Sequence, residues 1–111
     1  MVELKIYHSS LDLSIEIFHL LKRPELLREY EIANQLKRAA ISVSANISEG
    51  YLRSRKVFHN HLSIALGSAN EVMTLLVIVE RMQLLPTADL IAKYEIICKQ
   101  ITTLRKRINL S

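Results

Sequence analysis

The chain has 111 residues, half of them hydrophobic, a length that suits one domain with a single core. It has no uninterrupted apolar run close to the roughly 18 residues that cross a bilayer, and acidic side chains near its start argue against a signal peptide. The net charge of +4 favours anionic partners, and the single cysteine, Cys98, excludes an internal disulfide. We therefore expect a cytoplasmic protein with no membrane partner.

Apolar residues spaced three and four apart predict a first and a second helix. The first lies near residues 3–22, ends before Pro24, and is expected to bury Leu4, Tyr7, Leu11, Ile15 and Phe18. The second runs from about Tyr30 to Glu49, and Gly50 fits a left-handed cap at its C-terminus. Its core stripe consists of Ala33, Leu36, Ala40, Val43 and Ile47.

Two further helices follow, each introduced by a capping residue. Ser54 precedes a helix that reaches about residue 83, with the core stripe Phe58, Leu62, Ala65, Ala69, Val72, Leu76 and Val79. Thr87 precedes the last helix, with the stripe Leu90, Tyr94, Ile97, Ile101, Leu104 and Ile108. The sustained spacing and short connections predict an all-α fold, an antiparallel up-down-up-down four-helix bundle that forms one domain over residues 1–111.

The second and third helices each carry another stripe beside the core stripe. In the second helix this stripe consists of Gln35, Arg38, Ser42, Asn46 and Glu49. In the third it is apolar at both ends and polar at its centre, and consists of Val57, His61, Ile64, Ser68, Glu71, Leu75, Ile78 and Met82. Because two helices that each bury two faces exceed the needs of a lone small bundle, we predict a cyclic homo-oligomer. Its expected interface is a polar network of Gln35, Arg38, Ser42, Asn46, Glu49, Ser68 and Glu71, in which Arg38 pairs with Glu49 or Glu71. Pairing of the two helices within one subunit is the alternative.

The same two helices carry a motif that resembles the 23S rRNA-intervening sequence protein family, also called four helix bundle proteins. The matching residues are Gln35, Lys37–Ala40, Ser42, Asn46–Ile47, Glu49–Gly50, Ile64–Ala65, Gly67–Ser68 and Glu71. Two positions depart from the family pattern, Ser44 where proline is usual and Ser48 where alanine is usual. The resemblance implies a bacterial four-helix bundle, often a ring-shaped homopentamer, with no established catalytic activity and a link to ribosomal RNA genes.

In the predicted topology the start of the chain, the connection between the second and third helices, and the end of the last helix share one end of the bundle. That end collects seven cations, Lys5, Arg53, Arg55, Lys56, Arg105, Lys106 and Arg107, with Glu3 and Glu49 nearby. We predict weak, salt-sensitive and largely sequence-independent binding of RNA or DNA there. Tyr51 is the tyrosine expected to be free to stack on a base. A helix-dipole role for the last three cations, or a protein partner, is the alternative.

Catalytic and metal sites find little support in the sequence. Glu16 and His19 match the Glu-x-x-His of di-iron bundles, but the chain has no second such motif, so a solvated face is preferred. The pairs Arg53/His59 and Arg55/His61 resemble the Arg-x5-His spacing of HEPN-type ribonucleases, which is the alternative function. We predict that the protein is not an enzyme and uses no metal, cofactor or small-molecule substrate.

Overall fold

The structure is a computed structural model, and it describes residues 1–108. These residues form α1 (Val2–Leu20), the short 3₁₀ turn η1 (Pro24–Leu26), α2 (Tyr30–Gly50), α3 (Arg55–Arg81) and α4 (Ala88–Arg107). No strand occurs within this part of the chain. The prediction of an all-helical fold with four helices is confirmed.

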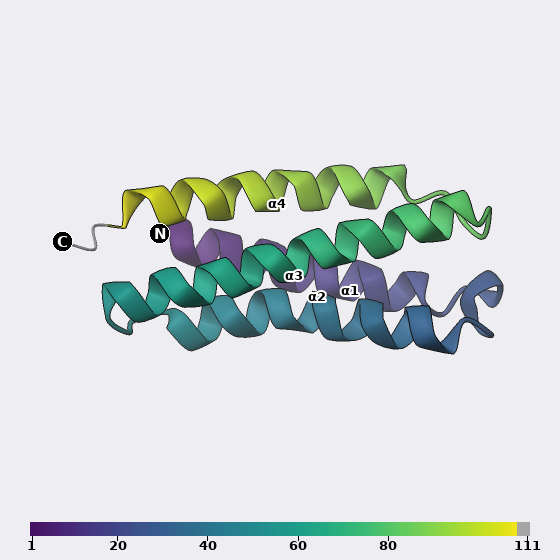
Figure 1. The fold of residues 1–111 in the computed structure, drawn as a ribbon, viewed down its shortest axis with the longest axis horizontal. Helices are drawn as coiled ribbons and strands as arrows, with labels where there is room; N and C mark the ends of the chain where they lie inside the picture. Colours follow the sequence, from purple (N-terminus) through teal and green to yellow (C-terminus); the bar gives the residue numbers. More distant parts are fainter. Residues whose placement is uncertain (109–111) are drawn as a thin grey trace.

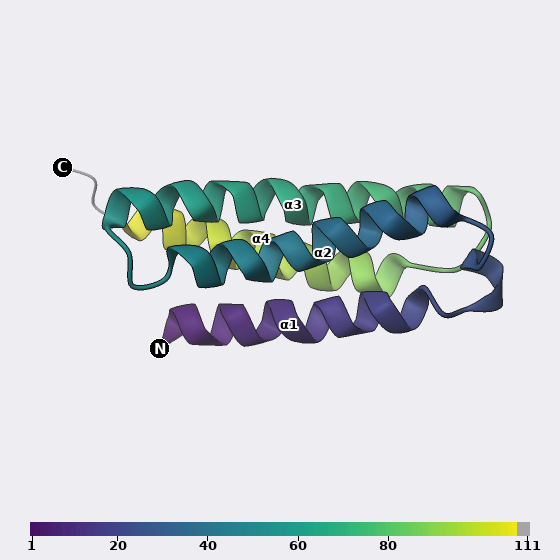
Figure 2. The same cartoon turned by 90° about the horizontal axis from the view of Figure 1, so that it is seen from below.

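The four helices form an elongated bundle that measures 48 × 20 × 20 Å. Each helix packs on two others, α1 on α2 and α4, and α3 on the same two. The chain reverses direction at each connection, so the start of α1, the α2–α3 connection and the end of α4 lie together at one end (Figures 1 and 2). We call this the basic end. The α1–α2 and α3–α4 connections lie at the opposite end.

The core is built from the predicted stripes of α2, α3 and α4. Side chains almost fully removed from solvent include Leu36, Val43 and Ile47 of α2, Leu62, Val72, Leu76 and Val79 of α3, and Tyr94, Ile97 and Ile101 of α4. The spacing of three and four residues keeps these side chains on one face of each helix. For these three helices the sequence therefore identified the buried face.

For α1 the predicted face was only partly right, since Tyr7 and Phe18 pack against the core but Leu4 and Ile15 do not. Ile15 is 52% exposed, whereas Ile6, Leu13 and Ile17 point into the core together with two serines. The serines hid this face because a hydrophobicity pattern counts them as polar. Ser14 donates its hydroxyl to the carbonyl oxygen of Ala40, 3.1 Å away on α2, and to that of Ser10 at 2.9 Å. Small, internally bonded serines allow α1 to approach α2 closely.

The α2–α3 connection is a tight turn in which the residue with positive φ is Leu52. The backbone N–H of Arg53 donates to the carbonyl oxygen of Gly50 at 3.1 Å. Tyr51 has φ −63° and ψ 135°, and Leu52 has φ 65°, which is the pattern of a type II turn. The predicted left-handed cap at Gly50 was therefore wrong, because no glycine in the described chain has positive φ. Helix packing instead requires that position 50 has no side chain.

The requirement at Gly50 comes from the first turns of α3. A Cβ atom on this residue would lie 2.8 Å from the Cβ of His61 and 2.9 Å from Cδ1 of Phe58. Gly67, in the middle of α3, has no such neighbour within 4 Å. The two glycines therefore differ in purpose.

The two predicted capping residues also differ. Ser54 caps α3 as expected, since its Oγ accepts the backbone N–H of Val57 at 3.2 Å. Thr87 precedes α4, but its hydroxyl donates to the carbonyl oxygen of Leu76 at 2.7 Å rather than capping the helix. Its backbone N–H is bonded to Glu80 Oε1 at 2.9 Å. Thr87 therefore ties the α3–α4 connection back onto α3.

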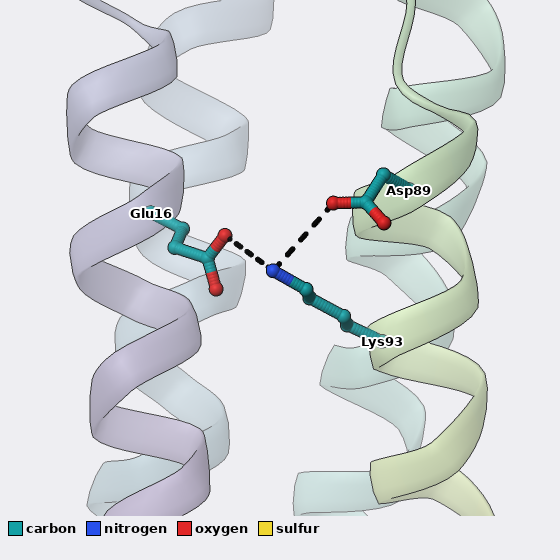
Figure 3. Close-up of polar contacts among 3 residues, drawn as sticks. All are labelled: Glu16, Asp89 and Lys93. Atoms are coloured by element: carbon teal, nitrogen blue, oxygen red, sulfur yellow. Dashed lines mark hydrogen bonds and ion pairs between the residues drawn. The ribbon is translucent and has the colours of Figure 1, made fainter.

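The seam between α1 and α4 is the most sparsely packed of the four. A groove of about 390 Å³ runs along it near the basic end, and a second of about 240 Å³ lies further along. Between the helices, Lys93 of α4 reaches Glu16 of α1, with Nζ 2.9 Å from Oε1, and lies 3.5 Å from Oδ2 of Asp89 (Figure 3). The hydrogen bond to Glu16 raises the pKa of Lys93.

Candidate nucleic-acid and subunit interfaces

The basic end brings side chains from three separate segments into one neighbourhood. Arg55, at the start of α3, lines the same hollow as Arg107 of α4 and the first residues of the chain. Lys5 of α1 lines a groove that Arg107 also borders, together with Lys99. Six of the seven predicted cations are exposed, and Arg105 is partly exposed. The fold therefore collects cations from both ends of the sequence, from Lys5 to Arg107.

Helix electrostatics distinguishes two groups among these cations, which together include five of the seven. Arg105, Lys106 and Arg107 occupy the last turn of α4, where the negative end of the helix dipole stabilises positive charge. Arg55 and Lys56 occupy the first turn of α3, where the dipole is positive and no acidic residue is present. Two cations at a helix N-terminus oppose the stability of that helix. Helix stability therefore explains the first group but not the second.

Tyr51, the residue predicted to be free for stacking, packs against other residues of the chain. Its ring packs edge-on against Phe58, with ring centroids 6.4 Å apart. It also lines a small cavity with Leu4 and Tyr7 of α1. The prediction failed because the turn at Leu52 directs its neighbour back toward the bundle.

Part of the predicted interface set forms a hydrogen-bond network between α2 and α3 of one chain. Ser68 Oγ donates to Ser42 Oγ at 2.8 Å. The Asn46 amide nitrogen donates to the carbonyl oxygen of Ser42 at 2.8 Å and approaches its Oγ at 3.1 Å. Asn46 Oδ1 is then left to accept from His61 Nδ1, 3.0 Å away. The sequence placed His61 in the right stripe but did not identify it as the partner of Asn46.

The other members of the predicted set, Gln35, Arg38, Glu49 and Glu71, are exposed. Within residues 1–108, Arg38 forms no ion pair with Glu49 or Glu71. Its expected acidic partner is therefore not supplied by the single chain.

Beside this network α3 keeps an apolar outer surface. Ile64 is 52% exposed, and Ile78 and Met82, which share its side of the helix, are also exposed. By length and composition α3 is apolar enough to cross a membrane, yet only 39% of its most apolar window is buried in the bundle. A soluble core helix passes the same test. We call Ile64, Ile78 and Met82 the outer apolar face.

Two of the residues considered for catalysis or metal binding, Glu16 and His61, already have partners within the chain. Nδ1 of His61 is hydrogen-bonded to Asn46, while Arg55 is exposed in the first turn of α3. Cys98 is partly buried on α4, which raises the pKa of its thiol, and its Sγ lies 3.8 Å from Oδ1 of Asn70. Residues 1–108 contain no group of three His, Cys, Asp or Glu side chains arranged to hold a metal ion.

Comparison with known proteins defines the class of this helical bundle. The sequence model of the 23S rRNA-intervening sequence protein matches residues 2–109. The chain belongs to that family. A protein of unknown function from the S23 ribosomal protein family of Bacteroides thetaiotaomicron, solved by crystallography, superimposes with a TM-score of 0.85. The two share 27% identity over 96% of this chain and 99% of the other. No curated protein matches the chain.

Proposed function

We propose that this protein is a non-enzymatic scaffold that assembles with copies of itself and binds the backbone of RNA or DNA through its basic end. The observation that carries the nucleic-acid part is the placement of Arg55 and Lys56. These cations lie at the positive end of the dipole of α3, which disfavours them, and the first turn has no acidic side chain. Arg53 lies beside them in the sequence. An anionic backbone would remove that electrostatic conflict.

The expected mode of binding follows from the kinds of side chain involved. Arginine and lysine on exposed helix ends form charge-assisted bonds to phosphate oxygens and release counterions, without reading base edges. Binding is therefore expected to be weak, salt-sensitive and largely independent of sequence. The family name, which refers to 23S rRNA, supports RNA as the first nucleic acid to test.

Self-association is supported by the outer apolar face and the exposed polar residues beside it. Large apolar side chains exposed along one side of a helix are typical of an interaction surface. Arg38, Glu49 and Glu71 would gain charged partners from a second copy. We propose a cyclic homo-oligomer, a pentamer by resemblance to the family, in which the basic ends share one face and their fields add.

A mobility or anisotropy titration with rRNA-derived duplex and single strands, at two salt concentrations, tests the nucleic-acid part. Reversing the charge at Arg53, Arg55 and Lys56 should abolish binding. In single-site variants that still bind, removal of one cation that neutralises a phosphate should reduce the logarithmic salt slope by about 0.9 on duplex. The matched control reverses Lys22, Arg23 and Arg28, which are exposed at the opposite end. Equal loss of binding in both charge-reversed variants, or no wild-type binding at low salt, refutes this part.

Sedimentation velocity tests the assembly. Ile64→Glu should shift the protein to smaller species while helix content stays constant, and Arg38→Ala should weaken assembly to a lesser extent. Ile96→Glu is the control, since Ile96 is as exposed as Ile64, at 58% against 52%, but lies on α4. A wild-type protein that is monomeric at micromolar concentration refutes self-association.

The non-enzymatic part is tested with an assay panel for ribonuclease, nuclease and metal-dependent hydrolase activity. We expect no turnover above background. Robust turnover that disappears on replacement of His59 or His61 would instead make the protein a ribonuclease of the Arg-x5-His type.

A further inference from the structure

Leu52 is the most exposed large hydrophobic residue of the described chain, at 86%. It lies at the tip of the α2–α3 turn and adopts φ 65°. Position three of a type II turn normally holds glycine or asparagine, because a Cβ atom disfavours this conformation. The leucine therefore incurs both backbone strain and exposure to water, and neither is offset by burial within the chain.

The surroundings of Leu52 are mainly cationic, although the exposed Glu49 precedes it by three residues. Arg53 follows it directly, Arg55 and Lys56 are the first two residues of α3, and all three are exposed. Tyr51 is directed the other way, onto Phe58. The tip therefore presents one apolar side chain framed by groups that bind phosphate.

We propose that Leu52 is a wedge that inserts between bases of the nucleic acid held by the basic end. This inference rests on the proposed function and specifies its target as nucleic acid whose stacking is easily opened, at a bulge or a flexible step. Proteins that kink nucleic acid insert single apolar side chains between base steps while cations hold the flanking phosphates. Strain at an exposed turn residue is consistent with a side chain retained for contact with a partner.

A membrane surface is the competing partner, since it also offers phosphate groups and an apolar interior. A single leucine in a turn is a poor membrane anchor, because binding strength there scales with the apolar area buried. A wedge needs only one side chain. The geometry of this tip therefore favours bases over lipid.

The experiment compares the wild type with Leu52→Gly on a short RNA or DNA duplex and on the same duplex with one unpaired bulged base. We expect the wild type to favour the bulged duplex by about tenfold, the effect of burying one leucine side chain. Leu52→Gly should lose this preference and keep the salt slope, because all cations remain. Its Tm should equal or exceed that of the wild type, since glycine relieves the positive φ.

Two further variants separate the wedge from side effects. Leu52→Asn also tolerates positive φ and should behave like Leu52→Gly. Leu27→Asn alters an exposed leucine beside the short 3₁₀ turn at the opposite end and should keep the full preference.

Each remaining outcome is decisive. Wild-type binding with the same preference in Leu52→Gly overturns the wedge but leaves the basic end as a binding face. No wild-type binding to any nucleic acid removes both. Leu52-dependent sedimentation with anionic phosphatidylglycerol vesicles, without binding to either duplex, replaces nucleic acid by a membrane surface.

Discussion

The hydroxyl group of Tyr94 provides a sharp test of how this core is stabilised. Tyr94 is completely buried in α4, and its hydroxyl oxygen has no hydrogen-bond partner within residues 1–108. A buried polar group without a partner costs about 1–3 kcal/mol, whereas the ring itself stabilises the core. Tyr94→Phe keeps the ring and removes the uncompensated group. We expect the variant to be about 1 kcal/mol more stable than the wild type, at the low end of that range.

Urea denaturation at neutral pH, followed by far-UV circular dichroism at matched protein concentration, measures this difference. On heating, 1 kcal/mol corresponds to roughly 4 °C in Tm for a domain of this size. A Tyr94→Phe variant that is less stable by 1 kcal/mol or more would show that the hydroxyl has a partner in solution and would refute the reasoning.

The same residue predicts a pH dependence. Burial, assisted by the nearby charge of Glu16, raises the pKa of Tyr94 well above its ordinary value of 10.0. Ionisation of Tyr94 therefore leaves the free energy of unfolding of the wild type unchanged below pH 10. This free energy falls as the pH rises further, because the hydroxyl ionises first in the unfolded state. The loss amounts to about 1.4 kcal/mol per pH unit. The stability advantage of Tyr94→Phe should accordingly widen above pH 10, and an advantage that stays constant would contradict the assigned burial.

Four other substitutions have outcomes fixed by local geometry, each measurable by urea denaturation. Gly50→Ala should destabilise by about 1–3 kcal/mol because the new methyl group overlaps α3, whereas Gly67→Ala should stabilise by about 1 kcal/mol through helix propensity; equal effects would refute the packing role of Gly50. Thr87→Val should cost about 1 kcal/mol because the bond to Leu76 is removed, and a neutral result would show that this bond is dispensable. Lys93→Met should leave the midpoint unchanged at physiological salt, because exposed ion pairs contribute little; a clear loss would show a stabilising role.

The sequence was sufficient wherever one physical effect dominated. In α3 an unbroken apolar stripe from Phe58 to Val79 determined both the helix and its buried face. Ser54 was identified as a cap because its hydroxyl bonds to the backbone of the helix that directly follows it. The seven cations could be assigned to one end because short connections make neighbouring helices antiparallel.

The sequence was insufficient where a residue serves a partner that is distant in the chain. Ser14 is buried because it reaches the backbone of α2, and Thr87 is bonded to the last two turns of α3. A glycine is needed at position 50 because two α3 side chains occupy the space its Cβ would fill. The left-handed conformation is adopted by Leu52 instead. Hydropathy and capping rules contain no information on these contacts.

The open seam between α1 and α4 has a consequence for how the native state fluctuates. α1 has neighbours on two sides, but its contact with α4 is sparse and includes an exposed ion pair that contributes little. By contrast, α2 packs closely on α3, and α3 packs closely on α4. Partial unfolding should therefore begin with the undocking of α1, so its backbone amides would exchange with deuterium earlier than those of α3. Such an opening would expose the faces of α2 and α4 that α1 covers, while the α2–α3 turn retains its shape.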